Sequence, residues 1–368
     1  MTPFCWAARH VSDIDPAAPT TALITRAMLG RVVAGLDVWD HWPVLEDDGS
    51  IATIAGGELV IALSAPSIGS PDDRHTLARL RLFHRVAGVW HDLGHLLPDG
   101  FSPGSREWAG SAVVDPAHRQ LTLHFTAAGR RDEAVLSFGQ RLFATTAAIE
   151  TGSPRLSGWS HPAETVAPDG SHYETRLGGG KTLGTTKAFR DPFVWRDPQD
   201  DAEYLLFAAS RAGTDSPWNG VVGLAQRRDG GWRLLPPIVD ATGLNNELER
   251  PHLVVIDRRR YLFWSTQASV FADGGPRGPN GLYGIVSDDI AGPWRPLNGS
   301  CLVLRNPDSA PFQAYSWQVF PDGSVWSFAD MVGLAAPPRD AAEARRHFGG
   351  VPAPCVTLVF DGDRVVIR

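Results

Sequence analysis

The chain lacks any long apolar run, which argues against a helical membrane protein. No stretch reaches the about 18 consecutive apolar residues that a transmembrane helix requires. The N-terminal residues MTPFCWAARHVSDID contain acids early and lack the apolar core of a signal peptide. We therefore expect no membrane partner and no signal peptide, and so a protein that is either cytoplasmic or secreted by an unconventional route.

Cysteine is also scarce, with three examples at Cys5, Cys301 and Cys355. Their number is odd and their spacing is wide, so they match neither a metal-binding spacing nor a disulfide framework. Buried or unreactive thiols are the simpler interpretation. From the residues we expect no metal and no other cofactor.

An excess of positive charge is missing too. The chain carries 34 Lys and Arg against 41 Asp and Glu, which gives a formal net charge of −7. This balance does not favour nucleic acid or an anionic membrane as a partner. It suits a neutral substrate. The sequence leaves the oligomeric state open.

Turn-forming and aromatic residues are abundant, with 38 glycines, 29 prolines and 13 tryptophans. Tryptophan either fills the core of a large β protein or stacks on sugar rings. Apolar segments separated by turns recur at a spacing of roughly 8–12 residues, which is typical of a sandwich, a barrel or a propeller. The predicted strands and hairpins cover residues 58–64, 79–86, 111–126, 134–145, 202–208, 220–226, 232–235, 252–256, 261–265, 281–286, 318–320, 325–328, 355–360 and 364–367.

Helices are expected at two places only. The apolar spacing predicts one over residues 20–36 and another over 339–348, which Gly349-Gly350 would end. Residues 151–181 are polar and read as long loops around one short strand. Because no low-complexity linker divides the chain, we expect one domain over residues 1–368, with residues 1–36 as a helical or extended lead-in. No clean repeat is visible, although a propeller with diverged blades would look the same.

Two familiar motifs are only partly present. Residues 178–182 (GGGKT) resemble the end of a phosphate loop, but Thr175 stands where the first glycine belongs. His91 and His95 have the spacing of a zinc helix, yet Gly94 disfavours a helix there and no third ligand is evident. A loop with two ordinary histidines is the better interpretation. A serine hydrolase has no support, because no G-x-S-x-G elbow occurs.

Three short acidic motifs suit carbohydrate chemistry: VWDHWP around Asp40, FRDP around Asp191, and ELERPH around Glu247 and Glu249. Each places a carboxylate beside an aromatic ring, an arginine or a second acid. Cleavage of a glycosidic bond needs two carboxyl groups and further groups that hold the ring. Taken singly, each motif has a structural alternative: an Asp that caps a turn, an Arg–Asp pair that closes a loop, and a solvated charged turn.

In combination, the motifs resemble glycoside hydrolase family 68, the levansucrases, inulosucrases and bacterial β-fructofuranosidases. The resemblance runs from about residue 37 to residue 315 and keeps the order and spacing of the family. It is carried by VWDHWPV, EWAGS, FRDPFV, ELERPH, YLFWSTQ, GLYGIVSDDIAGPWRPLN and QAYS.

The resemblance implies an all-β fold, a five-bladed β-propeller with a central funnel-shaped pocket and few short helices. It implies a retaining enzyme that cleaves sucrose and transfers the fructosyl unit to water, sucrose or short fructans. Asp40 would be the nucleophile, Glu249 the general acid/base and Asp191 the stabiliser of the transition state. The substrate-binding residues that it implies are Trp39, Trp108, Arg190, Glu247, Arg250, Gln267 and Tyr315.

The chain departs from the family pattern at several positions. Ala109 stands in EWAGS where many members have serine, and Gln267 stands where others have Arg or His. Both changes leave the balance of hydrolysis and transfer open. Some members bind a structural calcium through acids near the positions of Thr185 and Asn246, so we predict no calcium here.

Two alternatives remain at this stage. One is a five-bladed propeller glycosidase of the arabinanase or xylosidase kind, which uses two Asp and one Glu in the same order. The other is a propeller without catalytic activity that serves as a binding module.

Overall fold

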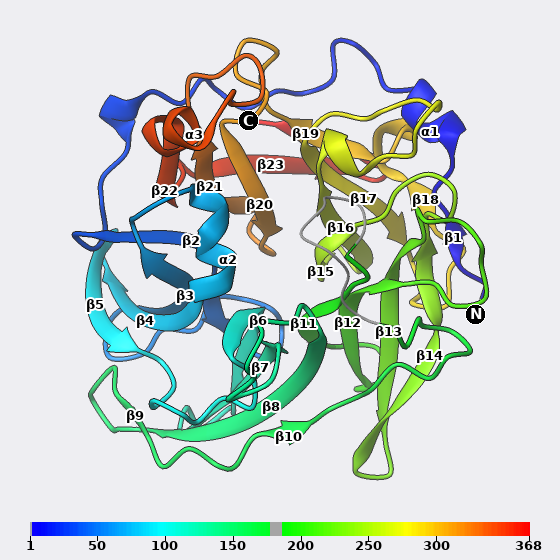
Figure 1. The fold of residues 1–368 in the computed structure, drawn as a ribbon. Coiled ribbons are helices and arrows are strands. Elements are labelled where there is room, and N and C mark those ends of the chain that lie inside the picture. The colour runs from blue at the N-terminus through cyan, green and yellow to red at the C-terminus, as the bar shows by residue number, and fades with distance from the viewer. Residues whose placement is uncertain (1, 177–185) are drawn as a thin grey trace.

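The computed structural model describes residues 2–176 and 186–368 of the chain. These residues form four hydrogen-bonded sheets around a common centre, and the nine-stranded one consists of two blades joined by a short parallel pairing between their first strands. The arrangement is that of the expected five-bladed β-propeller (Figure 1). The first blade contains β2 (Leu36–Leu45), β3 (Glu58–Pro66), β4 (Arg79–Val86) and β5 (Val89–His95). The second contains β6 (Arg106–Val114), β7 (Gln120–Ala128), β8 (Gln140–Ile149), β9 (Leu156–Ser157) and β10 (Ala163–Glu164).

The third blade is completed by the N-terminus. Strand β1 pairs in parallel with β14, so the blade comprises β1 (Phe4–Cys5), β11 (Phe189–Arg196), β12 (Glu203–Ser210), β13 (Gly220–Arg228) and β14 (Gly231–Asp240). The fourth comprises β15 (Glu249–Ile256), β16 (Arg259–Thr266), β17 (Gly281–Ser287), β18 (Arg295–Pro296) and β19 (Leu302–Arg305). The fifth comprises β20 (Ala314–Val319), β21 (Ser324–Met331), β22 (Phe348–Pro352), β23 (Val356–Asp361) and β24 (Arg364–Ile367).

Helical segments are short and lie between the strands. The α-helices are α1 (Ala8–Ser12), α2 (Arg74–Leu77) and α3 (Ala341–His347). The 3-10 turns are η1 (Arg26–Met28), η2 (Pro71–Asp73), η3 (Ala268–Val270) and η4 (Leu297–Gly299). Within residues 2–176 and 186–368, no helix combines the length and the apolar character that crossing a bilayer requires.

The first long strand of each blade lies nearest the centre: β2, β6, β11, β15 and β20 (Figure 1). Each of these inner strands has a break in its pairing register with the next strand of its blade. Such bulges bend a strand and turn a side chain away from its regular direction. Four of the breaks fall within or at the motifs VWDHWP, EWAGS, FRDP and ELERPH, and the fifth begins within QAYS. The irregular backbone of the fold therefore coincides with the motifs that the sequence analysis singled out.

The predicted helix over residues 20–36 is wrong. The only helical turn in the segment is the 3-10 turn η1, because other backbone groups of the segment bind the blades instead of one another. Thr21 N donates to the carbonyl of Arg305 at 2.9 Å, and Ile24 N donates to Gln313 Oε1 at 2.8 Å. Ile24 is buried in the core, whereas Leu23 and Met28 remain about half exposed.

Other local predictions need correction. Residues 134–139 precede β8 and are not a strand, and Val135 is largely exposed. Helix α3 is present, capped by the Asp340 side chain, but it passes directly into β22, so Gly349 and Gly350 lie in a strand. His91 and His95 lie on β5 rather than on a loop.

The loop region has two short strands, β9 and β10, where one was expected. The GGGKT segment and Thr185 lie outside the described residues. All three cysteines are free; Cys301 is buried, while Cys5 and Cys355 are exposed.

Candidate active site

The three predicted catalytic acids lie on the inner strands of the first, third and fourth blades, at or beside the bulges of these strands. Asp40 falls at the register break of β2, Asp191 at that of β11, and Glu249 immediately before that of β15. Asp191 adopts a left-handed backbone conformation with φ of 60°, which non-glycine residues rarely adopt. Strained residues of this kind persist only where their surroundings hold them, and they cluster at functional sites.

Arg190 connects the acids of β11 and β15. Its Nη2 atom donates to Glu247 Oε2 and to Glu249 Oε1, both at 2.8 Å, and its Nε atom lies 3.7 Å from Asp191 Oδ2. The guanidinium is nearly buried, so these charge-assisted hydrogen bonds are shielded from water. Burial lowers the pKa of Arg190, but the adjacent carboxylates outweigh this effect and raise it.

Tyr315 completes the surroundings of Glu249 from the fifth blade. Its hydroxyl donates to Glu249 Oε2, while Arg190 donates to the other carboxylate oxygen. Burial and the charge of Glu249 raise the pKa of Tyr315 well above 10, so the phenol is a donor at neutral pH. The side chain of Glu249 is 21% exposed, which leaves the carboxyl accessible from one side.

Arg250 contacts the cluster and links it to two other blades. It donates from Nη1 to the carbonyl and the hydroxyl of Ser316, at 3.3 and 2.9 Å, and from Nη2 to the carbonyl of His41 at 3.0 Å and to Gln318 Oε1 at 2.9 Å. Its backbone N–H donates to Asp191 Oδ2 at 3.1 Å. The side chain thus joins the inner strands of three blades, and its arrangement is that of a support for the acids.

Burial raises the pKa of three of the clustered carboxyls. For Asp40, burial is opposed chiefly by the positive charge of Arg250 and then by the Ser316 hydroxyl. For Asp191, burial outweighs the charge of Arg190 and raises the pKa to about 6. The pKa of Glu247 is also raised by burial, against the charge of Arg190. Carboxyls that compete for protons in this way are typical of acid/base sites.

The two predicted pocket tryptophans meet at a residue that the sequence did not point to. His75 on α2 makes edge contacts with Trp39 and Trp108 at 6.1 and 6.4 Å, and its carbonyl accepts from Trp108 Nε1 at 3.2 Å. Arg74 lies 5.5 Å from the centroid of the Trp39 ring. Trp39 itself is 1% exposed and belongs to the core, whereas Trp108 is half-buried.

Ala109 and Gln267 lie at the edges of the cluster. Ala109 is buried at the bulge of β6, and its carbonyl accepts from Thr126 Oγ1, an atom that also accepts from Asp191 N. Gln267 is half-buried and directly follows β16, two residues beyond Ser265, which pairs with Glu249. The strand register therefore places Gln267 at the same end of the blade as Glu247.

Sequence reasoning missed Ser316, Arg74 and His75. Ser316 follows Tyr315 within QAYS, so the motif itself was a signal for it. Arg74 and His75 come from a four-residue helix without any motif, and only the fold brings them to the tryptophans.

Among the described residues, no group of three or more His, Cys, Asp or Glu is arranged to hold a metal ion. Asn246, one of the two positions considered for calcium, accepts a hydrogen bond from Lys187 at 3.1 Å instead.

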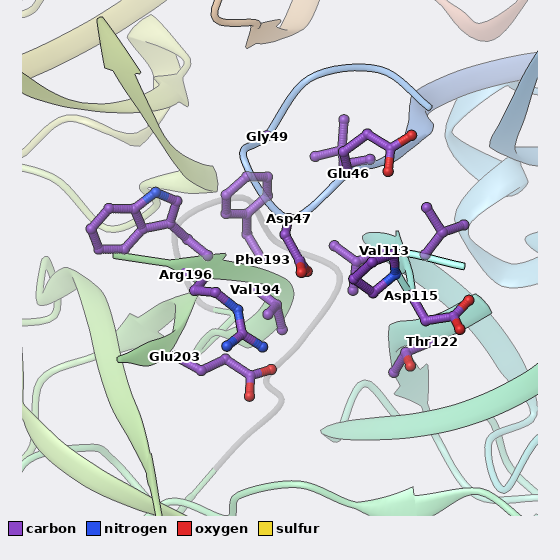
Figure 2. Close-up of a pocket in the computed structure, with 14 residues that line it drawn as sticks. Glu46, Asp47, Gly49, Val113, Asp115, Thr122, Phe193, Val194, Arg196 and Glu203 are labelled. Carbon is purple, nitrogen blue, oxygen red and sulfur yellow. The ribbon is translucent and has the colours of Figure 1, made fainter. Parts of the chain in front are cut away.

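A separate cavity of about 220 Å³ lies at the other end of the inner strands (Figure 2). Its lining includes Glu46 and Asp47 after β2, Asp115 after β6 and Arg196 at the end of β11. None of the predicted site residues lines it, so it is distinct from the acidic cluster.

The fold and the cluster together define a class: a β-propeller with a glycosidase-like set of carboxyls at its centre. A sequence model described as Levansucrase/Invertase matches residues 2–222 and 215–368. The chain belongs to this family, glycoside hydrolase family 68.

Individual relatives agree with this assignment. A levansucrase from Rahnella aquatilis is 30% identical over 100% of this chain and 94% of its own length. The structure of an inulosucrase from Halalkalicoccus jeotgali bound to kestose superposes with a TM-score of 0.88 at 35% identity, covering 100% of this chain and 95% of that one. A β-fructofuranosidase from Microbacterium saccharophilum K-1 gives a TM-score of 0.84 at 25% identity, covering 100% and 83%.

Proposed function

We propose that this protein is a retaining enzyme that cleaves sucrose and transfers its fructosyl unit to water, sucrose or short fructans. The family assignment supports the substrate class. The observation that carries the proposal is the Arg190 bridge, which holds the carboxyls of Glu247 and Glu249 on one guanidinium beside Asp191.

In this proposal Asp40 attacks the anomeric carbon of the fructosyl unit. Glu249 donates a proton to the glycosidic oxygen, so that the carbon–oxygen bond breaks and glucose leaves. Asp191 stabilises the cationic transition state through its negative charge. Water or a sugar hydroxyl then attacks the covalent fructosyl-enzyme, and Glu249 takes the proton back.

The remaining residues bind substrate in the same scheme. Glu247 and Gln267 lie toward the leaving glucose, while Arg190 and Trp108 hold the fructosyl unit. Tyr315 keeps Glu249 oriented. Arg250 donates four side-chain hydrogen bonds to protein acceptors. We therefore assign it an indirect role, in which it holds Asp40 and Asp191 in place rather than binding substrate.

Incubation with sucrose tests the proposal. We expect glucose release, with free fructose equal to glucose for pure hydrolysis and lower than glucose where transfer occurs. Asp40→Asn and Glu249→Gln should each lose about 10³-fold or more in kcat. Asp322→Asn, an exposed turn carboxylate, is the matched control and should retain activity.

Two outcomes would overturn the proposal. The first is pentose release from an aryl arabinoside without glucose release from sucrose. The second is near wild-type sucrose turnover in either Asp40→Asn or Glu249→Gln.

A further inference from the structure

The ammonium group of Lys187 is bound by three protein oxygens beside the acidic cluster. Its Nζ atom donates to the carbonyl of Pro217 at 2.5 Å, to Asn219 Oδ1 at 2.7 Å and to Asn246 Oδ1 at 3.1 Å. These oxygens come from two loops, the β12–β13 connection and the β14–β15 connection, while Lys187 itself leads into β11. One ammonium group therefore ties together three segments of the third and fourth blades.

The choice of lysine here is informative because the chain almost never uses it. The sequence contains two lysines, Lys181 and Lys187, among 34 basic residues. An ammonium is a compact charge with three donors, and here it meets three acceptors. A planar guanidinium has a different donor geometry and would not be equivalent. Asn219 and Asn246 are buried, so their side-chain oxygens would be costly to leave without a donor.

The ammonium connects to the site through Asn246. The Nδ2 atom of Asn246 donates to the carbonyl of Thr186 at 3.2 Å and lies 3.5 Å from Glu247 Oε1. The other oxygen of Glu247 accepts from Arg190, which follows Lys187 by three residues along the chain. Asn246 is thus held from both sides, with its oxygen on the ammonium and its nitrogen toward the carboxylate.

We propose that Lys187 is a positioning residue. Its ammonium group fixes Asn246, and Asn246 in turn fixes the carboxylate of Glu247, which is assigned to binding the leaving glucose. Lys187 contacts no substrate itself. The inference rests on the proposed function for the identity of the substrate, but the contacts that carry it do not depend on that identity.

The test compares Lys187→Met with wild type on sucrose. We expect KM to rise about tenfold while kcat changes less than about threefold, because Glu247 is assigned to binding the leaving glucose. Arg227→Met removes a positive charge from the same blade outside this network and is the matched control. Asn219→Ala removes one of the three oxygens and should raise KM in the same direction by a smaller factor, which keeps the test available if Lys187→Met folds poorly.

A double variant distinguishes a positioning role of Lys187 from a general loss of rigidity of the loops around it. In Glu247→Gln, adding Lys187→Met should change KM less than about twofold, because the group to be positioned is already impaired. An equal KM effect in both backgrounds, or an unchanged KM in folded Lys187→Met, would overturn the inference.

The midpoint of thermal unfolding tests the contacts of Lys187 without any substrate. Lys187→Met should lower the unfolding midpoint more than Arg227→Met does, and equal midpoints would overturn the inference. A wild-type protein that releases no glucose from sucrose would refute the proposed function instead, and the unfolding comparison would still decide whether the ammonium holds the loops.

Discussion

Replacing Arg250 by methionine tests whether this side chain supports the acids. The substitution keeps an unbranched stem, shorter by two atoms, and removes the charge and its four hydrogen bonds to Ser316, His41 and Gln318. These acceptors are buried and would be left without a donor. Removal of one buried charged partner typically costs about 3–5 kcal/mol, and at roughly 2 °C per kcal/mol we expect the unfolding midpoint to fall by about 6–10 °C.

The same change should alter the pH dependence of activity. The charge of Arg250 is the largest influence that opposes the effect of burial on Asp40, so its removal moves the pKa of Asp40 further up. In the proposed mechanism Asp40 must be ionised to attack the anomeric carbon. The acidic limb of kcat/KM for sucrose should therefore move to higher pH, and kcat near neutral pH should fall by at least about 10²-fold because the acids also lose their mechanical support.

Arg250→Lys is the informative comparison, because it keeps the charge but cannot reproduce the forked hydrogen bonds. We expect it to lose stability while its acidic limb stays close to that of the wild type. The reasoning is refuted if Arg250→Met unfolds within about 2 °C of wild type and shows an unshifted pH profile.

Two further predictions concern a buried carboxyl and a bulge. Burial raises the pKa of Asp191 from 3.8 to about 6. The folded protein therefore binds a proton that the unfolded chain releases, and it loses up to about 3 kcal/mol of stability as pH rises from about 4 through about 6. Asp191→Asn should abolish sucrose cleavage yet unfold at a higher temperature than wild type at pH 7, with the difference vanishing near pH 4; a lower midpoint at pH 7 would contradict this. A Cβ atom at Gly110 would lie 1.9 Å from the carbonyl oxygen of His124, whereas one at Gly139 would meet nothing within 4 Å. Gly110→Ala should therefore lower the unfolding midpoint by more than 5 °C or prevent folding, and Gly139→Ala should do neither. Scanning calorimetry of the two variants measures the difference.

The outer strands were predictable because they alternate or end at clear turns. The inner strands were harder, and the segment that forms β2 was not predicted as a strand. Eight of its ten residues are buried on one face or the other, so the period-two pattern of a half-buried strand is absent. The error at residues 20–36 has the opposite cause. A helical spacing of apolar residues is present there, but tertiary contacts with Arg305 and Gln313 take the backbone hydrogen bonds.

The residues of the site also fall into those that the sequence predicts and those that it does not. Residues within contiguous motifs, such as Asp40, Asp191 and Glu249, could be proposed from sequence, since the motif carries both the acid and its neighbours. The partners that support them could not. Lys187 reaches loops 30 and 59 residues further along the chain, and only the arrangement of the blades makes these contacts possible.

The charge balance of the cluster connects these observations. It contains four carboxyls and two guanidiniums: Asp40, Asp191, Glu247 and Glu249 with Arg190 and Arg250. Arg74 and Asp330, which also interact with Asp40, add one charge of each sign. With every group ionised, two negative charges would remain in a largely buried volume, and burial together with mutual repulsion raises the pKa of three of the acids. Protons in such a cluster belong to the group rather than to one residue.

This surplus suits the cationic transition state of the proposed chemistry. Once the bond begins to break, the fructosyl ring becomes cationic and offsets the negative charge that the protein could not offset itself. The cost of assembling four acids in the resting protein is thus recovered in the transition state, and the bulged inner strands are what bring those acids together.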